Sequence, residues 1–309
     1  QGFHKTYPKT LDRLNSIEGI EVRLLDLKKR TGGVQHAKFA LIDGRQTFLG
    51  SPNFDWRSLE HIQELSALID SAEVTAFYRS VFELDWRLAG GEEVPENDAA
   101  LRTGAPAPKV KLKYRDQTVQ VTPVASPKGL IPCAHDACWD LPRLLELIDG
   151  AKSTVRLQLL SYKPAYRNRT YFAELDNALR RAAARRVRVE MMVANWSQTR
   201  GRIEALKSLQ VLPNVEVKIV TMPEWSGGFI NFARVVHSKY LVADGARSWI
   251  GTSNGSGDYF TASRNVGLIV EGGAFGADLD RYFERLWKSG DYAKTVDPCA
   301  EYAAPERSR

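Results

Sequence analysis

HAKFALIDGRQTFLGSPN, residues 36–53, returns later in the chain as HSKYLVADGARSWIGTSN, residues 237–254. Both copies carry His, Lys, Asp, Gly and Asn at the same places, and corresponding residues lie 201 positions apart without an insertion. A fixed offset shared by five functional residue types indicates an internal repeat. The stretch therefore predicts two related halves with the same chemistry in each.

The His-x-Lys pair that opens each copy is typical of phosphate chemistry. His36 and Lys38 stand two positions apart in a run that alternates along a strand, so both side chains share one face. An imidazole can attack or donate a proton, while a neighbouring ammonium and an amide donor hold phosphate oxygens. The candidate catalytic groups of the two copies are His36, Lys38, Asn53, His237, Lys239 and Asn254.

This arrangement resembles the HKD motif, H-x-K-x4-D-x6-G-[GS]-x-N, of the phospholipase D superfamily. Both copies fit, except that Thr252 stands at a position that is usually Gly or Ser. The resemblance implies an α/β fold of two pseudo-repeated halves, each a mostly parallel or mixed sheet flanked by helices, with the active site at their interface. It also implies a metal-independent, two-step phosphodiesterase: one His attacks phosphorus and forms a phosphohistidine, and the other protonates the leaving oxygen and then activates water.

Residues beside the motifs narrow the resemblance to the lysosomal 5′-exonuclease branch, which includes poxvirus relatives. The similar stretches are residues 50–59, 64–65, 233–235, 250–254 and 257–261, within a similarity that runs from about residue 38 to about residue 287. The resemblance implies a 5′ exonuclease that acts on single-stranded DNA or RNA. The alternative is a phospholipase D or transphosphatidylase acting on phospholipid head groups, and the apolar stretch 222–230 keeps it open. A catalytically inactive binding protein is disfavoured because both motifs are intact.

Three acidic residues are further catalytic candidates. Asp43 and Asp244 belong to the motif, although their place at the end of each strand favours a structural role. Glu64 lies 28 residues after His36, and the position equivalent to Glu64 in the second half is Asn265. Many superfamily members use an acidic group there to hold a catalytic imidazole, so the Glu/Asn difference could separate nucleophile from acid. The sequence does not say which His pairs with Glu64.

The candidate substrate-binding residues flank the motifs. The aromatic ones are candidates for stacking on bases, with core packing as the alternative for each, and the arginine is a candidate phosphate contact or salt bridge. These candidates are Ser51, Trp56, Trp196, Arg234, Ser253, Tyr259 and Phe260. We expect no cofactor and no metal site, because His135 between Cys133 and Cys138 has no second ligand pair at zinc spacing.

Composition limits the possible partners. The chain has 309 residues, a formal net charge of +6 and a pI near 9.1, which suit a polyanionic substrate or an anionic surface. No run of eighteen apolar residues occurs, so we expect no transmembrane segment. Cys133 and Cys138 could close a small loop in an oxidising compartment, or all three cysteines could be free thiols. With the resemblance, this favours a secreted, periplasmic or lysosomal and lumenal location.

The chain divides into a first half at 1–89, a Gly- and Pro-rich linker at 90–110 and a second half at 111–309. Patterning predicts strands at 19–25, 64–70, 119–124, 154–162, 187–195 and 215–220, and helices at 74–88, 140–148, 171–185, 199–209 and 275–287. The first half is shorter by about eighty residues, if repeats are of similar length. We therefore expect an amino-terminally truncated half whose open sheet edge is covered by a homodimer partner or by a missing amino-terminal segment.

Overall fold

The two copies of the repeated stretch fold into the same β-hairpin. In the computed structural model, which describes residues 8–94, 107–133 and 136–307, β1 (Phe39–Ile42) pairs with β2 (Gln46–Gly50), and β9 (Tyr240–Ala243) pairs with β10 (Arg247–Gly251). Each hairpin turns at an Asp-Gly dipeptide whose two residues have positive φ, 50° and 67° in the first copy. Asp and Gly tolerate this left-handed backbone, which matches the twist of a hairpin.

The repeat continues beyond the hairpins. The short helix α4 (Trp56–Glu60) corresponds to α9 (Gly257–Thr261), and the long helix α5 (Ala72–Ala89) corresponds to α10 (Gly273–Trp287), again with starts 201 positions apart. Between them, strand β3 (Ser66–Asp70) ends 201 positions before β11 (Asn265–Glu271). The internal repeat therefore covers a hairpin, a helical turn, a strand and a helix in each half.

The remaining elements surround these two units. Before β1 lie only two short helices among the described residues, α2 (Pro8–Asn15) and α3 (Leu27–Thr31). Before β9, the second half adds β4 (Val110–Tyr114), β5 (Gln117–Ser126), α6 (Asp140–Asp149), β6 (Thr154–Leu159), α7 (Ala173–Ala184), β7 (Arg188–Ala194), the 3-10 turn η2 (Asn195–Ser197), α8 (Ile203–Gln210) and β8 (Val215–Val220). The strand β12 (Ala293–Thr295) follows α10.

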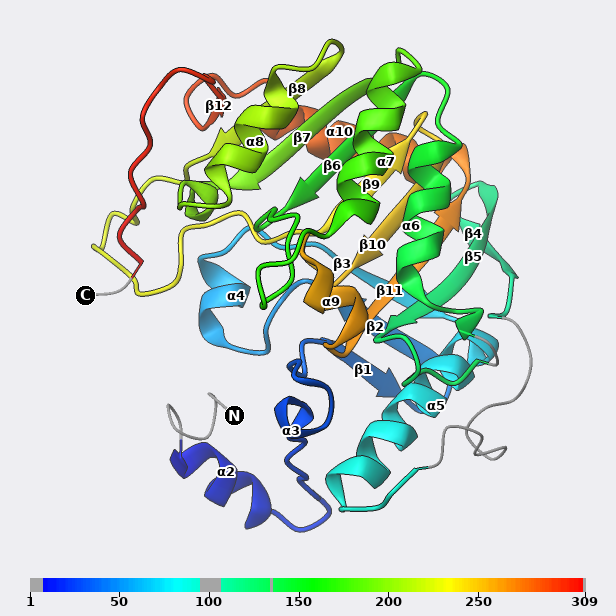
Figure 1. Cartoon of the computed structure of the whole chain (residues 1–309). Helices are drawn as coiled ribbons and strands as arrows, with labels where there is room; N and C mark the ends of the chain where they lie inside the picture. Colours follow the sequence, from blue (N-terminus) through cyan, green and yellow to red (C-terminus); the bar gives the residue numbers. More distant parts are fainter. Residues whose placement is uncertain (1–7, 95–106, 134–135, 308–309) are drawn as a thin grey trace.

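These strands form two sheets of unequal size (Figure 1). The second half has a nine-stranded mixed sheet in the order β12-β8-β7-β6-β9-β10-β11-β5-β4, in which β6, β7 and β8 run parallel. Helices α6, α7 and α8 cover one face of it and α10 covers the other. The first half has only β1-β2-β3, and all of its pairings are antiparallel. The α/β class is confirmed, but the prediction of a mostly parallel or mixed sheet is wrong for the first half.

The other patterning predictions have mixed outcomes. The helices predicted at 74–88, 140–148 and 275–287 are confirmed within two residues at each end. The strand predicted at 19–25 is wrong, because those residues form no regular element and pair with no strand. Helix α5 ends at Ala89 and β4 begins at Val110, next to the two proposed boundaries, whereas 95–106 of the proposed linker lie outside the described residues. None of the helices in the described ranges combines the length and apolar character needed to cross a membrane.

The two halves share a hydrophobic core. One face of α5 packs with the three-stranded sheet onto β5 and β11 of the large sheet, so first-half and second-half side chains are buried in one cluster. Its members include Leu49, Val74, Phe77, Tyr78, Val81, Val121, Val266 and Leu268. The Tyr78 hydroxyl also donates to the Gly267 carbonyl at 2.5 Å. The halves are therefore joined by apolar burial as well as by their polar contacts.

A fully buried ion pair fixes α5 to the start of β11. Arg264 is 0% exposed, and its Nε and Nη2 donate to the Asp85 carboxylate at 2.7–3.0 Å. Its Nη1 donates to the Ser126 and Leu130 carbonyls, at 2.7 and 2.6 Å. Gln35, next to the first catalytic candidate, donates to the same carboxylate at 2.9 Å. Each nitrogen of this buried guanidinium donates to at least one acceptor, which favours the tolerance of a buried ion pair.

We expect Arg264→Met to lower the free energy of unfolding by about 3–5 kcal/mol, because it leaves the Asp85 carboxylate buried without its cation. Chemical denaturation followed by circular dichroism measures this change. Arg45→Met is the matched control: it breaks the Arg45–Asp70 pair, whose side chains are 72% and 49% exposed, and should leave stability nearly unchanged. Equal effects of the two substitutions would contradict the structural role given to Arg264.

Candidate active site

The His-x-Lys pairs were predicted to lie along strands, but each lies in the extended segment just before β1 or β9, and that segment pairs with the opposite half. The His36 backbone N–H donates to the Arg264 carbonyl at 3.0 Å, and the His237 N–H donates to the Gln63 carbonyl at 2.8 Å. Isolated parallel bridges join Gln35 to Arg264 and Gln63 to Val236. The two contacts are equivalent under the 201-residue offset, so they describe an approximate two-fold relation between the halves. This crossing brings the two motif imidazoles, His36 and His237, into one cluster.

The two imidazoles are held by different partners, each from the other half. The Nδ1 atom of His237 lies 2.8 and 3.0 Å from the two carboxylate oxygens of Glu64. The Nδ1 atom of His36 lies 3.1 Å from the amide oxygen of Asn265. Glu64 and Asn265 are the equivalent residues that the sequence singled out, and each serves the His of the opposite copy. One imidazole therefore has an anionic partner and the other a neutral partner.

The surroundings of Asn265 fix the tautomer of His36. The Asn265 Nδ2 group donates to the carbonyls of Tyr259 and Ser263, at 2.7 and 3.3 Å, so its Oδ1 must face the imidazole. Thr252, the residue that departs from the usual motif, donates to that Oδ1 at 2.9 Å. Because the oxygen only accepts, Nδ1 of His36 carries the hydrogen and its Nε2 carries the free lone pair.

The two lysines bind back onto their own motifs. Lys38 Nζ donates to the His36 carbonyl at 2.7 Å, and Lys239 Nζ donates to the His237 carbonyl. Both ammonium groups are buried, with Lys239 at 0% exposure. Burial lowers the pKa of Lys239 to about 7, against the opposing effect of the Glu64 carboxylate. Burial, and then the charge of Lys239, lowers the pKa of Lys38 well below its usual value. The site therefore concentrates cationic groups that an anion would stabilise.

The same environment acts on the other ionisable groups of the site. Burial lowers the pKa of His36, with further effects in the same direction from Lys38 and Lys239. Burial and the two lysines likewise lower the pKa of His237. Burial raises the pKa of Glu64, and the lysines partly oppose this. A negatively charged phosphate bound among these groups would favour the protonated forms of both the imidazoles and the ammonium groups.

The motif asparagines differ in exposure. Asn254 is 1% exposed, and neither its Oδ1 nor its Nδ2 has a hydrogen-bond partner among the described residues. Asn53, its equivalent, is exposed. Two serines just before these asparagines are buried. Ser51 donates to the Leu65 carbonyl at 3.2 Å, and Ser253 donates to the Asp140 carboxylate at 3.1 Å. The Ser253 hydroxyl is fully buried and already bonded, as the Lys239 ammonium is, so substrate binding by Ser253 stays a prediction.

Asp43 and Asp244 do not reach the catalytic cluster. Both lie in the hairpin turns, five positions beyond the motif lysines, about 16 Å along an extended strand. Asp43 is exposed. Asp244 accepts hydrogen bonds at 2.8–3.0 Å from the Lys152, Ser153 and Thr154 backbone and from the Ser153 hydroxyl. This place in the left-handed turns favours a structural role for both Asp residues, and a catalytic role for either stays a prediction.

Burial separates the aromatic candidates. Phe260 is 1% exposed and stacks on Phe172 in the core, with ring centroids 5.7 Å apart, so the prediction that it stacks on bases is wrong. Tyr259 meets the His36 ring edge-on, at 5.0 Å between centroids. Trp56 is 49% exposed, and Trp196 is partly buried. The Arg234 guanidinium donates to the Pro223 carbonyl at 2.8 Å, in the loop that leads to the second motif.

Some contributors gave no signal in the sequence. Asp140 is fully buried and accepts from the Ser126 and Ser253 hydroxyls, which fixes the turn before Asn254. Burial raises the pKa of Asp140 to about 6, although these hydrogen bonds oppose the rise. Tyr282 donates to the Glu64 carbonyl at 3.1 Å. Both residues stand in helices far from the motifs in sequence, so their roles depend on the tertiary fold alone.

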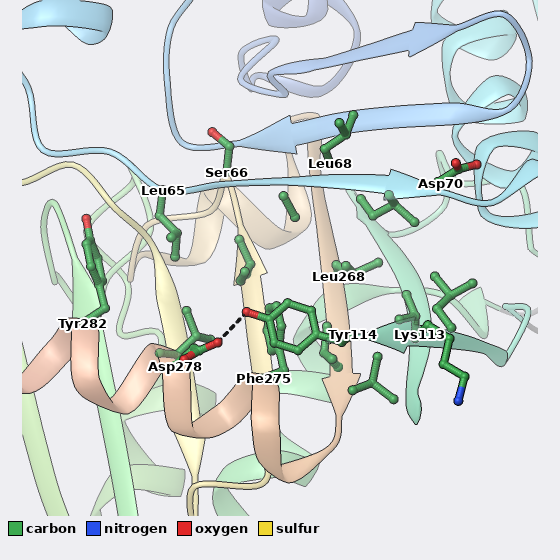
Figure 2. Close-up of a pocket in the computed structure, with 18 of the residues that line it drawn as sticks. Leu65, Ser66, Leu68, Asp70, Lys113, Tyr114, Leu268, Phe275, Asp278 and Tyr282 are labelled. Atoms are coloured by element: carbon green, nitrogen blue, oxygen red, sulfur yellow. Dashed lines mark hydrogen bonds between the residues drawn. The ribbon is translucent and has the colours of Figure 1, made fainter. Parts of the chain in front are cut away.

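A separate cavity lies near the site, and the described residues offer no group of metal ligands. A cavity of about 680 Å³ lies between β3 and the Tyr114 and α10 side of the large sheet, with Tyr282 and Leu65 at one end (Figure 2). It is mostly apolar, and none of the catalytic candidates lines it, although Leu65, next to Glu64, does. Within 8–94, 107–133 and 136–307, no three His, Cys, Asp or Glu side chains are grouped as metal ligands.

Two His-x-Lys segments, each leading into a β-hairpin and related by an approximate two-fold axis within an α/β fold, define a protein of the phospholipase D type. The model of the family described as "PLD3/4, PLD-like domain" matches residues 5–223. The chain belongs to this family.

Individual relatives agree with this assignment. The chain is 34% identical over 305 residues to "5'-3' exonuclease PLD4" of Mus musculus, covering 90% of this chain and 59% of that protein. It is 32% identical over 307 residues to "5'-3' exonuclease PLD3" of Xenopus tropicalis, covering 92% and 61%. The chain thus spans about three fifths of the length of these curated relatives.

A solved structure supports the fold. The phosphatidylserine synthase of Haemophilus influenzae Rd KW20 superimposes with a TM-score of 0.62 at 11% sequence identity, covering 93% of this chain and 69% of that one. At this identity the likeness concerns the arrangement of strands and helices only.

We expect Asp244→Asn to lower the free energy of unfolding at pH 7 by about 1 kcal/mol, with allowance for solvent screening. Burial raises the pKa of Asp244, but hydrogen bonds from the Thr154, Lys152 and Ser153 backbone outweigh this and lower it from 3.8 to about 2. The folded carboxylate therefore stabilises the protein above pH 3.8, and this contribution is lost as the pH falls from 3.8 to 2.

Thermal denaturation of both proteins between pH 2 and 7 measures the effect, and the difference should shrink over that acidic window. Asp43→Asn, in the equivalent exposed turn, is the matched control and should change little. A pH-independent difference would rule out the proposed carboxylate contribution.

Proposed function

We propose that the chain is a metal-independent phosphodiesterase that removes nucleotides from the 5′ end of single-stranded DNA or RNA. The observation that carries this proposal is the pair of imidazoles, His36 and His237, held from opposite halves beside two buried ammonium groups. Such a cluster suits a phosphodiester, because the negative charge of the phosphate would stabilise the buried cationic groups. The names of the relatives, 5'-3' exonucleases, support the choice of nucleic acid and of the 5′ end.

We assign His36 as the nucleophile and His237 as the general acid and base. The Nε2 lone pair of His36 attacks phosphorus, the N–P bond forms, and the bond to the leaving oxygen breaks as His237 donates a proton to that oxygen. His237 then takes a proton from water, the water oxygen attacks phosphorus, and the N–P bond breaks. The partners support this order, because the Glu64 carboxylate favours a protonated His237 and neutral Asn265 leaves His36 uncharged.

Lys38, Lys239 and Asn254 are proposed to hold the non-bridging phosphate oxygens. The two lysines flank the imidazoles, and the Asn254 amide is buried with its polar atoms free for a ligand. Groups fixed in place before the reaction stabilise a developing charge without reorganisation. Asn53, Trp56, Tyr259 and Arg234 stay candidates for contacts with the nucleotides on either side, with Trp196 considered further below.

The lipid alternative rests on one surface. The segment between β8 and β9 exposes Trp225 and Phe232, which are 46% and 48% exposed. Exposed aromatic side chains beside a phosphate site would also suit a membrane interface, where the same two imidazoles would act on a phospholipid head group. Hydrolysis of phosphatidylcholine vesicles compared with oligonucleotides separates the two substrates.

We also propose an oxidising compartment and a covered sheet edge. Cys133 and Cys138 form a disulfide, and Cys299 is a free exposed thiol. Disulfides persist in secreted, periplasmic and lumenal proteins, which supports such a location. Strands β1 and β3 are the edges of their small sheet, whereas their equivalents β9 and β11 each pair with a further strand. A second copy or an amino-terminal segment is proposed to cover these edges, and light scattering of the full-length protein distinguishes the two.

We expect the protein to degrade a 5′-labelled single-stranded oligonucleotide in the presence of EDTA, releasing label from the first cleavage onward. A 3′-labelled strand should shorten progressively. His237→Ala should reduce the rate by about 10²–10⁴-fold, because it removes the general acid and base. Asp43→Asn, in the exposed turn, is the control and should retain activity. A folded protein that degrades neither labelled strand would overturn the nuclease proposal.

The assignment of roles predicts where a covalent intermediate accumulates. In His237→Ala, bis(4-nitrophenyl) phosphate should form an adduct on His36, because 4-nitrophenolate leaves without a proton and the water step lacks its base. Peptide mass spectrometry locates the adduct. In the converse variant, His36→Ala, no adduct should form. An adduct on His237 in that variant would reverse the two roles.

A further inference from the structure

Beyond the two motifs, a second group of aromatic and cationic side chains lies beside the site. Trp196, in the turn after β7, meets Phe232 edge-on with ring centroids 6.3 Å apart. The guanidinium of Arg307 lies over the Trp196 ring, at 5.6 Å from its centroid. Arg202 donates to the Trp196 carbonyl at 3.3 Å. We refer to Trp196, Arg202, Phe232 and Arg307 as the arginine–aromatic surface.

The carboxyl-terminal segment is attached so that it contributes to this surface. After β12 it passes α8, where Lys207 donates to the Ala300 carbonyl at 2.6 Å, and its last described residues reach the segment between β8 and β9 (Figure 1). There the Phe232 N–H donates to the Arg307 carbonyl at 2.7 Å. The Lys207 ammonium also lies 5.4 Å from the Tyr302 ring centroid. These contacts bring Arg307 to a surface formed by Trp196, Arg202 and Phe232, which lie 75 to 111 positions earlier in the chain.

Arg202 and Arg307 both contact Trp196, the first at its carbonyl and the second over its ring. Burial, and then the charge of Arg307, lowers the pKa of Arg202, while Tyr259 opposes the change. Among the described residues, neither guanidinium forms an ion pair with a carboxylate. Two like charges held together without a counter-ion favour the binding of an anion between them. Tyr259 links this surface to the catalytic centre, because its ring contacts His36 at 5.0 Å.

We propose that the arginine–aromatic surface is a subsite for single-stranded nucleic acid, placed one or more nucleotides from the cleaved phosphate. A base stacks on the exposed Phe232 ring, and Arg202 and Arg307 bind a backbone phosphate. Alternating rings and guanidinium groups are the usual composition of such surfaces, because every base has a stackable face and every nucleotide a charge. The subsite rests on the proposed nuclease function, but it is tested by binding and not only by turnover.

A lipid bilayer fits this surface less well. Phe232 is the one strongly exposed apolar side chain of the four, whereas interfacial membrane binding needs a broad apolar face that inserts. Trp196 is partly buried, with one neighbour at its edge and a guanidinium over its face. A flexible chain that carries one phosphate per base suits this combination of one exposed ring and two guanidinium groups.

The test measures binding of a fluorescent hexathymidylate and of a dithymidylate to the inactive His36→Ala protein by anisotropy over a range of salt concentrations. Arg202→Ala and Arg307→Ala should each weaken hexathymidylate binding about tenfold and reduce the slope of log K against log salt by about 0.7. Dithymidylate binding should change little. Phe232→Leu should weaken hexathymidylate binding about 5- to 100-fold without changing the slope. Lys113→Ala, which removes an exposed cation from β4, is the matched control.

The outcomes separate the subsite from the catalytic proposal. Hydrolysis of bis(4-nitrophenyl) phosphate by the unmodified protein reports on the imidazoles alone. If that hydrolysis occurs but the arginine variants bind hexathymidylate as Lys113→Ala does, the subsite is overturned and the phosphodiesterase proposal stands. If the variants bind more weakly but no diester is hydrolysed, the subsite stands and the catalytic proposal fails. Binding of the same variants to phosphatidylserine vesicles is measured in parallel. If the arginine variants lose binding to these vesicles but not to hexathymidylate, the subsite is overturned in favour of a lipid surface.

Discussion

The site depends on two reciprocal backbone hydrogen bonds, from His36 N–H to the Arg264 carbonyl and from His237 N–H to the Gln63 carbonyl. Each bond crosses from one half to the other. The residue after each accepting carbonyl, Glu64 after Gln63 and Asn265 after Arg264, holds an imidazole. A backbone contact therefore sets the position of a side-chain contact one residue away. Neither half contains a complete set of partners, so the catalytic cluster exists only when both halves are packed together.

Sequence patterning predicted the repeated parts of this fold well. The 201-residue offset identified the repeated motif, which folds as a hairpin in both halves, and the same offset extends through α4 and α9 to α5 and α10. It could not predict which His pairs with Glu64, because a separation of 28 residues is the same whether the contact lies within a half or between halves. The crossing of the chain decides this. Phe260 was misjudged for a similar reason: its burial depends on Phe172, a distant residue that no local pattern identifies.

The unequal sheets explain why the shared core matters. The first half has three antiparallel strands, and its apolar face is buried against β5 and β11 of the larger sheet. A small sheet of this kind gains much of its stability by burying area against a neighbour. The Arg264–Asp85 pair adds direction to that burial, since its fixed donors determine how α5 sits on β11. Arg264 therefore serves both purposes at this interface: its side chain fixes α5, and its carbonyl holds the His36 backbone.

The difference between Glu64 and Asn265 has a consequence for how a strand can lie in the site. Two identical halves around a two-fold axis would accept a phosphodiester equally well in either direction. One carboxylate and one amide make the two sides unequal, and in the proposed mechanism the oxygen that needs a proton would lie on the His237 side. A nucleic acid strand has two chemically distinct ends, and an unequal site converts that difference into a sense of travel along the strand. In the proposed mechanism, the difference between Glu64 and Asn265 would therefore contribute to the direction in which the enzyme works.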